Sequence, residues 1–422
     1  MNPRKLLKKI TPSFILSWYH WCLAGLGALI YGFPSKKLIV IGVTGTSGKS
    51  TTVDFICRIL EEAGHKVAST SSIRFKVAGK EWKNKMKMTM PGRLVIQKLL
   101  AQAVKENCTY AVLEVTSEGI KQFRHKFINF DTAVFLNLTP EHLDSHGGFV
   151  NYRNAKVELF KAAKNVHIAN TDDENVKYFL EIPHQRTITF ATENSADIKA
   201  KDIRTEQGRI SFSVESIPFT LNLIGQFNVI NALAAIAVAV SIGISLQTAQ
   251  KALEKVKGMP GRLEIVTQDP FLTVVDYAFT PDQLQASYAS IKKFSGGKSL
   301  ICVLGACGGG RDAWKRPVLG KIASQNCREV IITNEDPYDE DPWEIMEQVA
   351  GGIDNTKDTY HLILDRKEAI KKALELATVD DAVIITGKGA EPLMCLADGI
   401  KVPWDDREIV KEQLKSIPDT CS

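Results

Sequence analysis

The sequence contains no pair of cysteines separated by two residues, because its eight cysteines are scattered along 422 positions. This argues against a structural zinc site and favours a reducing cytosol. It also has no basic stripe with interleaved aromatic residues, and its net charge is only +5, so nothing favours binding to nucleic acid. There is no internal repeat and no low-complexity tract. The apolar content of 44% is typical of a soluble globular protein, and the length predicts two or three domains.

The first 37 residues lack both a small-residue cleavage site and an uninterrupted apolar span. Basic residues at positions 4, 5, 8 and 9 precede an apolar stretch at 14–33 that contains two tryptophans and two tyrosines. Ser17 and His20 dilute this stretch, which disfavours a membrane span, and the missing cleavage site disfavours a signal peptide. Two interpretations stay open. The segment is either a helix at a membrane surface, with its basic residues near the headgroups, or a helix packed on the protein or on a second copy.

A nucleotide-binding pattern follows this segment. An apolar strand is expected at 38–43 and a helix at 52–63, joined by a glycine-rich turn. The turn reads Gly45, Thr46, Ser47, Gly48, Lys49, Ser50 and Thr51. It is shorter than the general phosphate-loop pattern, which needs a glycine where Val43 stands. Backbone amides and the helix N-terminus would face a phosphate, Lys49 would reach the outer phosphates, and Ser50 would offer its hydroxyl to Mg²⁺.

Strands and helices alternate along the rest of the chain. Strands are expected at 110–115, 132–138 and 166–169, and helices at 93–105, 151–163 and 228–242, which predicts a largely parallel sheet with helices on both faces. The stretch 198–223 resembles a small antiparallel edge, and the glycines and proline of 256–261 predict an interdomain hinge. Beyond it, strands at 272–277, 299–304, 329–333, 360–364 and 382–386 alternate with helices.

These patterns predict an α/β protein, with a central P-loop parallel-sheet ATPase domain followed by a Rossmann-like C-terminal domain. No GxGxxG follows the first strand of the second domain, so a dinucleotide role is not expected. The expected domains are a basic and apolar N-terminal helical segment at 1–37, an ATP-binding domain at 38–258 and a C-terminal domain at 259–422.

Charged and imidazole side chains follow two of the predicted strands. Glu114 ends one strand, and His142, Asp144 and His146 follow another. The carboxyl ends of parallel strands are where an open α/β sheet binds its ligand. We therefore expect Ser50, Glu114 and His142 to share one or two Mg²⁺ ions.

Taken together, these motifs resemble the Mur ligase superfamily, and among its members they are most similar to UDP-N-acetylmuramoyl-tripeptide synthetases, the MurE type. The resemblance covers residues 38–406 and rests on these segments in order: TGTSGKSTT, LEVTSEG, NLTPEHLDSHG, NYRNAKVELF, GQFNVINALAA, GMPGRLE, VDYAFTPD, GACGGGRDAWKRP, TNEDPYDEDP and TGKGAEPL.

The resemblance implies a cytoplasmic, ADP-forming amide ligase of peptidoglycan precursor synthesis. ATP would phosphorylate a carboxylate of a muramoyl-peptide-like acceptor, and an amino group would attack the acyl phosphate. Lys49 and Mg²⁺ would stabilise the transferring phosphoryl group. Ser50, Glu114, His142 and Lys156 would hold the metal. Lys156 aligns with the lysine that is carbamylated in this family, although by its own sequence context it is an ordinary helix-surface lysine.

The resemblance also implies three groups of binding residues. The nucleotide would contact Asn228, Asn231, Arg262 and Asp276, although Asn228 is also a good helix cap. The acceptor would contact Thr89, Thr116, Gln122 and Arg124. The incoming amino acid would contact Glu335, Asp336, Tyr338, Gly387, Lys388 and Glu391.

The sequence departs from the family in three places. Only 37 residues precede the strand that leads into the phosphate loop, too few for the uridine-binding domain, so the acceptor need not be held by its UDP group and can be lipid-linked or free as well as UDP-linked. Tyr338 stands where the diaminopimelate-specific form has arginine, which favours lysine or another amino acid. Phe279 and Glu118 replace histidines of the family pattern.

Two other functions remain as alternatives. One is another ADP-forming amide ligase on the same scaffold, either like folylpolyglutamate synthase or acting on a lipid-linked precursor. The other is a non-catalytic ATP-binding scaffold at the inner face of the membrane. The complete set of Lys49, Ser50, Glu114, His142 and Lys156 argues against the scaffold.

Overall fold

The computed structural model describes residues 12–206, 208–354 and 360–415. The chain forms two compact units. Unit 1 comprises Met1–Leu138, Val150–Ala200 and Ile230–Leu253, and unit 2 comprises Thr139–Phe149, Lys201–Val229 and Glu254–Ser422. The four basic residues predicted near lipid headgroups lie outside the described residues. None of the helices in the described ranges is long and apolar enough to cross a membrane.

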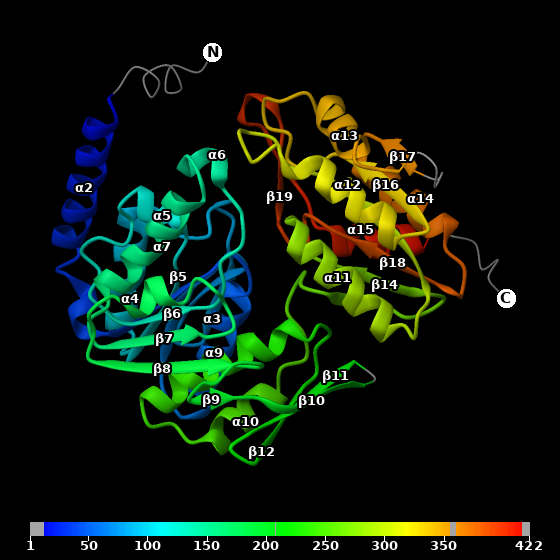
Figure 1. Ribbon diagram of the computed structural model, residues 1–422. Coiled ribbons are helices and arrows are strands. Elements are labelled where there is room, and N and C mark those ends of the chain that lie inside the picture. The colour runs from blue at the N-terminus through cyan, green and yellow to red at the C-terminus, as the bar shows by residue number, and fades with distance from the viewer. Residues whose placement is uncertain (1–11, 207, 355–359, 416–422) are drawn as a thin grey trace. The chain divides into compact units, whose positions relative to one another are not determined.

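Unit 1 is built on a nine-stranded sheet with the strand order β4-β3-β2-β5-β1-β6-β7-β8-β9 (Figure 1). Its strands are β1 Ile39–Thr44, β2 Val67–Thr70, β3 Arg74–Val77, β4 Lys80–Lys83, β5 Tyr110–Glu114, β6 Phe130–Phe135, β7 Val166–Asn170, β8 Arg186–Ala191 and β9 Ile198–Lys199. All neighbours are parallel except β2–β3 and β3–β4. The central strand β1 lies between β5 and β6. It is apolar along its length because both faces of the sheet are covered.

Helices connect these strands. The helical elements are α2 Ser13–Ile30, η1 Pro34–Lys37, α3 Lys49–Glu62, α4 Arg93–Lys105, α5 Ser117–Lys121, α7 Phe149–Ala162, α8 Lys177–Leu180, α9 Phe227–Ser241 and α10 Leu246–Glu254. Helix α2 packs against α4. The short helix α6, Leu143–His146, belongs to unit 2.

Unit 2 contains a three-stranded antiparallel sheet and a six-stranded sheet. The small sheet has the order β10-β11-β12, with β10 Lys201–Glu206, β11 Arg209–Val214 and β12 Ile217–Leu221. The larger sheet has the order β13-β14-β18-β15-β16-β17. Its strands are β13 Glu264–Thr267, β14 Leu272–Val275, β15 Ser299–Leu304, β16 Glu329–Thr333, β17 Tyr360–Ile363 and β18 Asp381–Ile385. Only β13 is antiparallel to its neighbour. A ribbon of β19 Leu393–Cys395 and β20 Lys401–Pro403 follows.

Two apolar clusters cover the two faces of the six-stranded sheet. Strand β15 supplies Leu300, Cys302 and Leu304 to one cluster and Ile301 and Val303 to the other, because successive side chains of a strand point to opposite faces. The first cluster includes α11 Pro281–Phe294, α12 Lys315–Asn326 and α13 Pro342–Ala350, and the second includes α14 Arg366–Leu376 and α15 Asp406–Leu414.

The observed elements confirm the predicted α/β fold class, although several strands, among them β2, β8 and β13, were not predicted. Helix α3 begins at Lys49 rather than at residue 52, because the Lys-Ser-Thr of the loop forms the first helical turn. The stretch 198–223 supplies only one short edge strand, β9, to the large sheet. Its β10–β12 form a separate sheet, and β9 pairs with β8 in parallel. The β3–β4 hairpin was not predicted, since its residues are mostly charged.

A buried ion pair joins α14 to α15. The guanidinium of Arg366 donates to both carboxylate oxygens of Asp406 at 2.9 and 2.8 Å, and both side chains are fully buried. Arg366 also donates to Thr386 O, and the indole of Trp404 donates to Asp406. Burying two charges is tolerated only when each is paired and hydrogen-bonded.

We predict that Asp406→Ala lowers the free energy of unfolding by about 3–5 kcal/mol, because it leaves a buried guanidinium without its partner. The exposed pair Lys367–Glu412 joins the same two helices and supplies the control, since Lys367→Ala should leave stability unchanged. Urea titration of both variants measures the difference. Equal losses in the two variants would contradict the role of burial.

Candidate functional site

The phosphate-loop residues form a tight turn between β1 and α3. Gly48 is the residue before α3 and has φ +82°, a left-handed conformation that favours glycine. A side chain there would also collide with its surroundings, since an added Cβ would lie 2.2 Å from Asn231 Oδ1. The predicted nucleotide residue Asn231 therefore lies directly against the loop. Its Oδ1 also accepts from the hydroxyl of Thr52 at 3.4 Å.

Asn137 holds the other side of the loop. Its Oδ1 accepts from the backbone amides of Thr46 and Ser47 at 3.1 and 2.9 Å, and its Nδ2 donates to Ser47 O. The hydroxyl of Thr46 is 2.9 Å from the hydroxyl of Tyr152. The sequence analysis missed Asn137 and Tyr152 as loop contacts. Both stand within the motifs that were aligned, in NLTPEHLDSHG and NYRNAKVELF.

The predicted metal residues Ser50 and Glu114 are brought together in unit 1. The Ser50 hydroxyl donates to Glu114 Oε2 at 2.8 Å. The backbone amide of Ser72 donates to the same oxygen at 2.9 Å, and the hydroxyls of Ser50 and Ser72 are 2.7 Å apart. A hydroxyl and a carboxylate oxygen are the kind of ligand that Mg²⁺ prefers.

Two lysines converge on the carbonyl of Gly45. Lys49 Nζ donates to Gly45 O and Thr46 O, both at 2.9 Å. Lys156 Nζ donates to Gly45 O at 2.7 Å and lies 4.7 Å from the centre of the Tyr152 ring. Lys156 is only 2% exposed, so the interpretation of an ordinary helix-surface lysine is wrong. Helix α7 turns this position inward, toward the loop.

The predicted acceptor residues lie near the N-terminus of α4. Thr116 caps α5 by accepting from Gly119 N, and Thr89 is half-buried in the connection before α4. Arg124 donates to Gln122 Oε1 at 2.8 Å and to Met90 O. Arg93, which the sequence analysis missed, donates to Gln122 O at 2.9 Å.

Arg93 and Arg124 thus form a cluster of positive charge around Gln122. Burial lowers the pKa of Arg124, and the charge of Arg93 lowers it further. Their hydrogen bonds within the described residues go to neutral acceptors. Two guanidiniums held in this way are suited to bind an anion.

His142 lies in unit 2, at the start of α6, and has φ +57°. Asp312 fixes this helix because its carboxylate accepts from the amides of Leu143 and Asp144 at 3.2 and 3.1 Å. Glu141, which precedes His142, forms a buried ion pair with Lys315 at 3.0 Å. Asp144 is exposed and His146 is half-buried.

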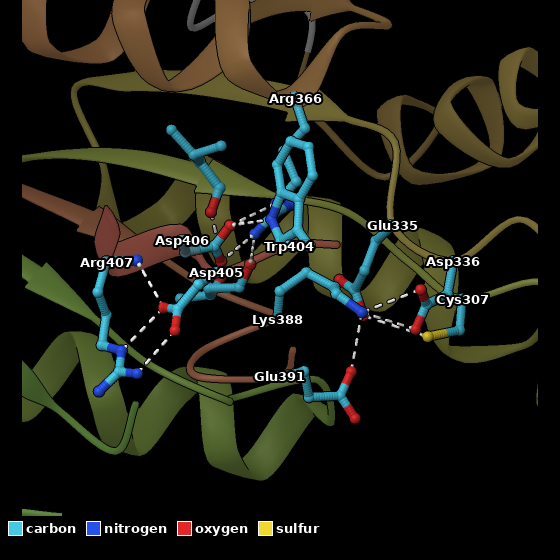
Figure 2. A network of polar contacts seen from close by, with 12 residues as sticks. Cys307, Glu335, Asp336, Arg366, Lys388, Glu391, Trp404, Asp405, Asp406 and Arg407 are labelled. Carbon is cyan, nitrogen blue, oxygen red and sulfur yellow. Dashed lines mark hydrogen bonds and ion pairs between the residues drawn. The ribbon is translucent and has the colours of Figure 1, made fainter. Parts of the chain in front are cut away.

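The predicted amino-acid residues surround Lys388, which is fully buried (Figure 2). Its Nζ donates to both oxygens of Asp336 at 2.9 Å and to Glu391 Oε2 at 2.8 Å. Tyr277 donates to the other oxygen of Glu391 at 2.8 Å. Lys388 is therefore an internal counter-ion for the acidic loop, and it is not available to a ligand as a free cation.

Glu335 lies beside this cluster with one oxygen unsatisfied. Its Oε1 accepts from the Cys307 thiol at 3.2 Å, whereas its Oε2 is buried without a hydrogen-bond partner among the residues that the structure describes. Burial raises the pKa of Glu335, although the charges of Arg366 and Lys388 oppose the shift. Gly387 has φ +104°, and a Cβ there would lie 1.9 Å from Glu335 Oε2, so only glycine fits.

Arg311 is a further positive charge near this loop that the sequence analysis missed. Burial acts to lower its pKa, but the net shift is upward because Cys307, Tyr277 and Tyr338 lie close to it. Tyr338 has φ +52° and packs against Gly309, where an added Cβ would lie 2.7 Å from Tyr338 Cδ2.

The predicted nucleotide residues of unit 2 have internal partners. The guanidinium of Arg262 stacks 4.3 Å from the centre of the Tyr277 ring. Asp276 accepts from Leu263 N and from the Ser287 hydroxyl. Asn228 is not the residue before α9, because the helix begins at Phe227. The side-chain amide of Asn228 donates to Ile224 O at 2.9 Å.

No cluster of three or more His, Cys, Asp or Glu side chains suited to a metal ion occurs among the described residues. The proposed metal ligands include a serine and a lysine, which such a cluster would not contain. Their donor set fits Mg²⁺ when Lys156 carries a carboxylate-like group.

A glycine-rich loop at the carboxyl end of the central strand, with a lysine, a serine and a strand-end carboxylate around it, defines an ATP-binding P-loop enzyme. Profiles of known families identify the particular kind. The Mur ligase middle domain matches residues 43–239, and the Mur ligase glutamate ligase domain matches residues 261–389.

Individual relatives are ligases of the same family. The chain is 38% identical over 402 residues to a UDP-N-acetylmuramoyl-L-alanyl-D-glutamate–2,6-diaminopimelate ligase of Clostridium botulinum, which covers 94% of this chain and 82% of the relative. It is 39% identical to the enzyme of the same name from Syntrophomonas wolfei, covering 93% and 81%. The chain therefore belongs to the Mur ligase family, and it is an ADP-forming, ATP-dependent amide ligase.

Solved structures show the same fold. A structure of a UDP-N-acetylmuramoyl-L-alanyl-D-glutamate–2,6-diaminopimelate ligase has a TM-score of 0.60 and 31% identity, covering 90% of this chain and 78% of that one. Mycobacterium tuberculosis folylpolyglutamate synthase has a TM-score of 0.72 but only 16% identity, covering 87% and 92%. The second likeness concerns the fold alone. The relatives do not favour the alternative of a folylpolyglutamate synthase or a scaffold.

We predict that Gly48→Ala weakens ATP binding at least about tenfold, because the methyl group displaces Asn231 from the loop in addition to straining φ. Gly64→Ala is the matched control, since Gly64 has φ +87° but nothing within 4 Å of an added Cβ. Titration with a fluorescent ATP analogue measures the affinity. If both variants bind ATP equally well, the contact with Asn231 is not what the loop requires.

Proposed function

We propose that this ligase joins an amino acid to the peptide carboxylate of a muramoyl-peptide-like acceptor through an acyl phosphate, in peptidoglycan precursor synthesis. The observation that supports this most is the arrangement around the phosphate loop. Ser50 bonds Glu114 there, and the buried Lys156 reaches the same loop carbonyl as Lys49. The names of the relatives, which state a muramoyl peptide and a diamino acid as substrates, support the same reaction.

In this proposal Lys49 and the loop amides from Gly45 to Thr51 bind the ATP phosphates. Ser50, Glu114, His142 and Lys156 hold Mg²⁺ at two sites, and the ions would supply positive charge to the transferring phosphoryl group. Asn228, Asn231, Arg262 and Asp276 contact the rest of the nucleotide. Lys49 Nζ already lies at the loop, where it donates to Gly45 O and Thr46 O.

Lys156 is proposed to be carbamylated. A buried amine is desolvated, which favours its neutral form, and only a neutral amine adds carbon dioxide. The resulting carbamate would present oxygen ligands where an ammonium group would repel a metal ion. The burial of Lys156 and its place at the loop support this assignment.

The incoming amino acid is proposed to bind in unit 2 among Glu335, Asp336, Tyr338, Gly387, Lys388 and Glu391. Lys388 pairs with both Asp336 and Glu391, so Glu335, whose Oε2 has no hydrogen-bond partner among the described residues, remains to attract an amino group. Arg311 supplies a partner for a single carboxylate. With Tyr338 in place of arginine, a second carboxylate has no equivalent partner in the loop, which favours lysine over diaminopimelate.

The acceptor is proposed to bind at Thr89, Thr116, Gln122 and Arg124, and we add Arg93. The two guanidiniums suit a carboxylate or phosphate of the acceptor. Whether the acceptor is UDP-linked, lipid-linked or free is an outcome of the assay below.

We propose residues 38–258 as the ATP-binding region, 259–422 as the amino-acid region and 1–37 as the segment that contacts the inner face of the membrane.

An assay of phosphate release tests the function. We expect turnover with ATP, Mg²⁺, a diamino acid and a muramoyl peptide, offered with and without UDP. Lys156→Ala should abolish turnover, and short carboxylates such as formate should restore part of it by replacing the carbamate. Lys161→Ala on the same helix is the control, because Lys161 is exposed and pairs with Glu158 at the helix surface. An absence of turnover with every acceptor would contradict the proposal.

A separate prediction concerns the choice of amino acid at Tyr338. Tyr338→Arg should raise kcat/KM for meso-diaminopimelate relative to lysine by about tenfold or more, since one charge-assisted hydrogen bond is worth roughly 1.5–3 kcal/mol. Tyr338→Phe, which removes only the hydroxyl, should leave the ratio unchanged. Competition between the two amino acids in one reaction measures it, and an unchanged ratio in Tyr338→Arg would show that this position does not select the substrate.

A further inference from the structure

Helix α2 carries small residues on its inner side and large apolar residues on its outer side. Ala24 and Ala28 are buried. An added Cβ at Gly27 would lie 3.5 Å from the backbone oxygen of Arg93 in α4. This close packing fixes the helix to unit 1, and Trp21 adds an edge-on contact with Phe127, with ring centres 5.1 Å apart. Figure 1 shows α2 along one side of unit 1.

The outer side of α2 carries exposed apolar residues, whereas a surface helix of a globular protein usually carries polar residues on its outer side. Trp18 is 70% exposed and Leu29 is 66% exposed. We define the α2 face as the exposed apolar residues Ile15, Trp18, Tyr19, Leu26, Leu29 and Ile30. They recur every three or four residues, so they share one side of the helix. Leu94 and Val95 in the first turn of α4 are exposed as well. A contiguous face of this kind marks an interaction site.

The charge of residues 1–37 indicates which kind of partner the α2 face binds. Residues 1–37 contain six of the 53 basic residues and none of the 48 acidic ones, which leaves 47 basic and 48 acidic residues in the rest of the chain. The positive net charge of the protein therefore resides in this segment. Lys36 and Lys37, directly after α2, are exposed. A second copy bound symmetrically through this face would bring two such segments together and would be repelled.

The composition agrees with a lipid surface. Tryptophan and tyrosine prefer the boundary between headgroups and acyl chains, and lysines beside them attract anionic lipids. The helix cannot be surrounded by lipid, because its inner side packs closely on unit 1. Its 18 residues span about 27 Å at 1.5 Å per residue.

We propose that the α2 face, with Leu94 and Val95, docks on an anionic bilayer, with Lys36 and Lys37 at the lipid phosphates. This surface is separate from the nucleotide and amino-acid sites. The inference rests on the proposed membrane contact of residues 1–37 and deepens it by naming the surface and the lipid, and it holds whichever acceptor the ligase uses.

Flotation of the full chain with lipid vesicles tests the inference. We expect binding to vesicles of phosphatidylcholine with phosphatidylglycerol, weaker binding to phosphatidylcholine alone, and loss at high salt. The double variant Trp18→Ser, Leu29→Ser should bind about tenfold less, because it removes the two most exposed apolar side chains of the face. The double variant Trp343→Ser, Ile400→Ser is the control, since both residues are exposed apolar side chains of unit 2.

Equal vesicle binding by the two double variants would overturn the inference, as would an absence of binding by the unaltered chain. Sedimentation equilibrium tests whether the α2 face binds a second copy of the chain instead. A dimer that dissociates in Trp18→Ser, Leu29→Ser, without vesicle binding, would assign the face to a second copy and also overturn the proposal. Phosphate release with a soluble acceptor should be the same in all variants, which keeps this test distinct from that of the ligase reaction.

Discussion

The conformation of the loop between β1 and α3 is the constraint on which the nucleotide site depends. Asn137 binds two of its amides, and Asn231 lies so close to Gly48 that no side chain is tolerated there. These two asparagines come from different parts of the chain, after β6 and within α9. The loop thus keeps its shape because the sheet and α9 hold it from both sides, and its amides are oriented in advance for an anion.

Charge is distributed differently in the two units. In unit 1 Lys49 lies at the phosphate loop, and Arg93 and Arg124 bond to neutral acceptors, an arrangement that suits anionic ligands. In unit 2 two buried cations are neutralised internally, Lys388 by Asp336 and Arg366 by Asp406, whereas Arg311 is proposed to bind a carboxylate of the amino acid. This division agrees with a reaction in which phosphates and a carboxylate are handled by one unit and an amino group by the other.

The α2 helix illustrates how a tertiary contact changes the meaning of a sequence pattern. The apolar stretch at 14–33 was compatible with a helix at a membrane surface or a packed helix; the packing on α4 is observed, and the membrane contact stays a proposal. Its small residues pack on α4, while its tryptophan and leucine side chains face outward. Periodicity alone could not assign the sides, because the stretch is apolar all around and only the position of α4 distinguishes them.

Local patterns in the sequence determined the strand and helix order, most element boundaries and the phosphate loop, because apolar alternation, helix caps and the glycine-rich turn act over a few residues. Aligned motifs also identified Ser50, Glu114 and Lys156. Only the tertiary structure decided that Ser50 bonds Glu114, 64 residues away, that Lys156 is buried against Gly45, and that Arg93 joins Arg124. It also decided that Lys388 forms an ion pair with Asp336. These facts depend on contacts between distant segments, and such contacts follow from how sheets and helices pack rather than from any local pattern.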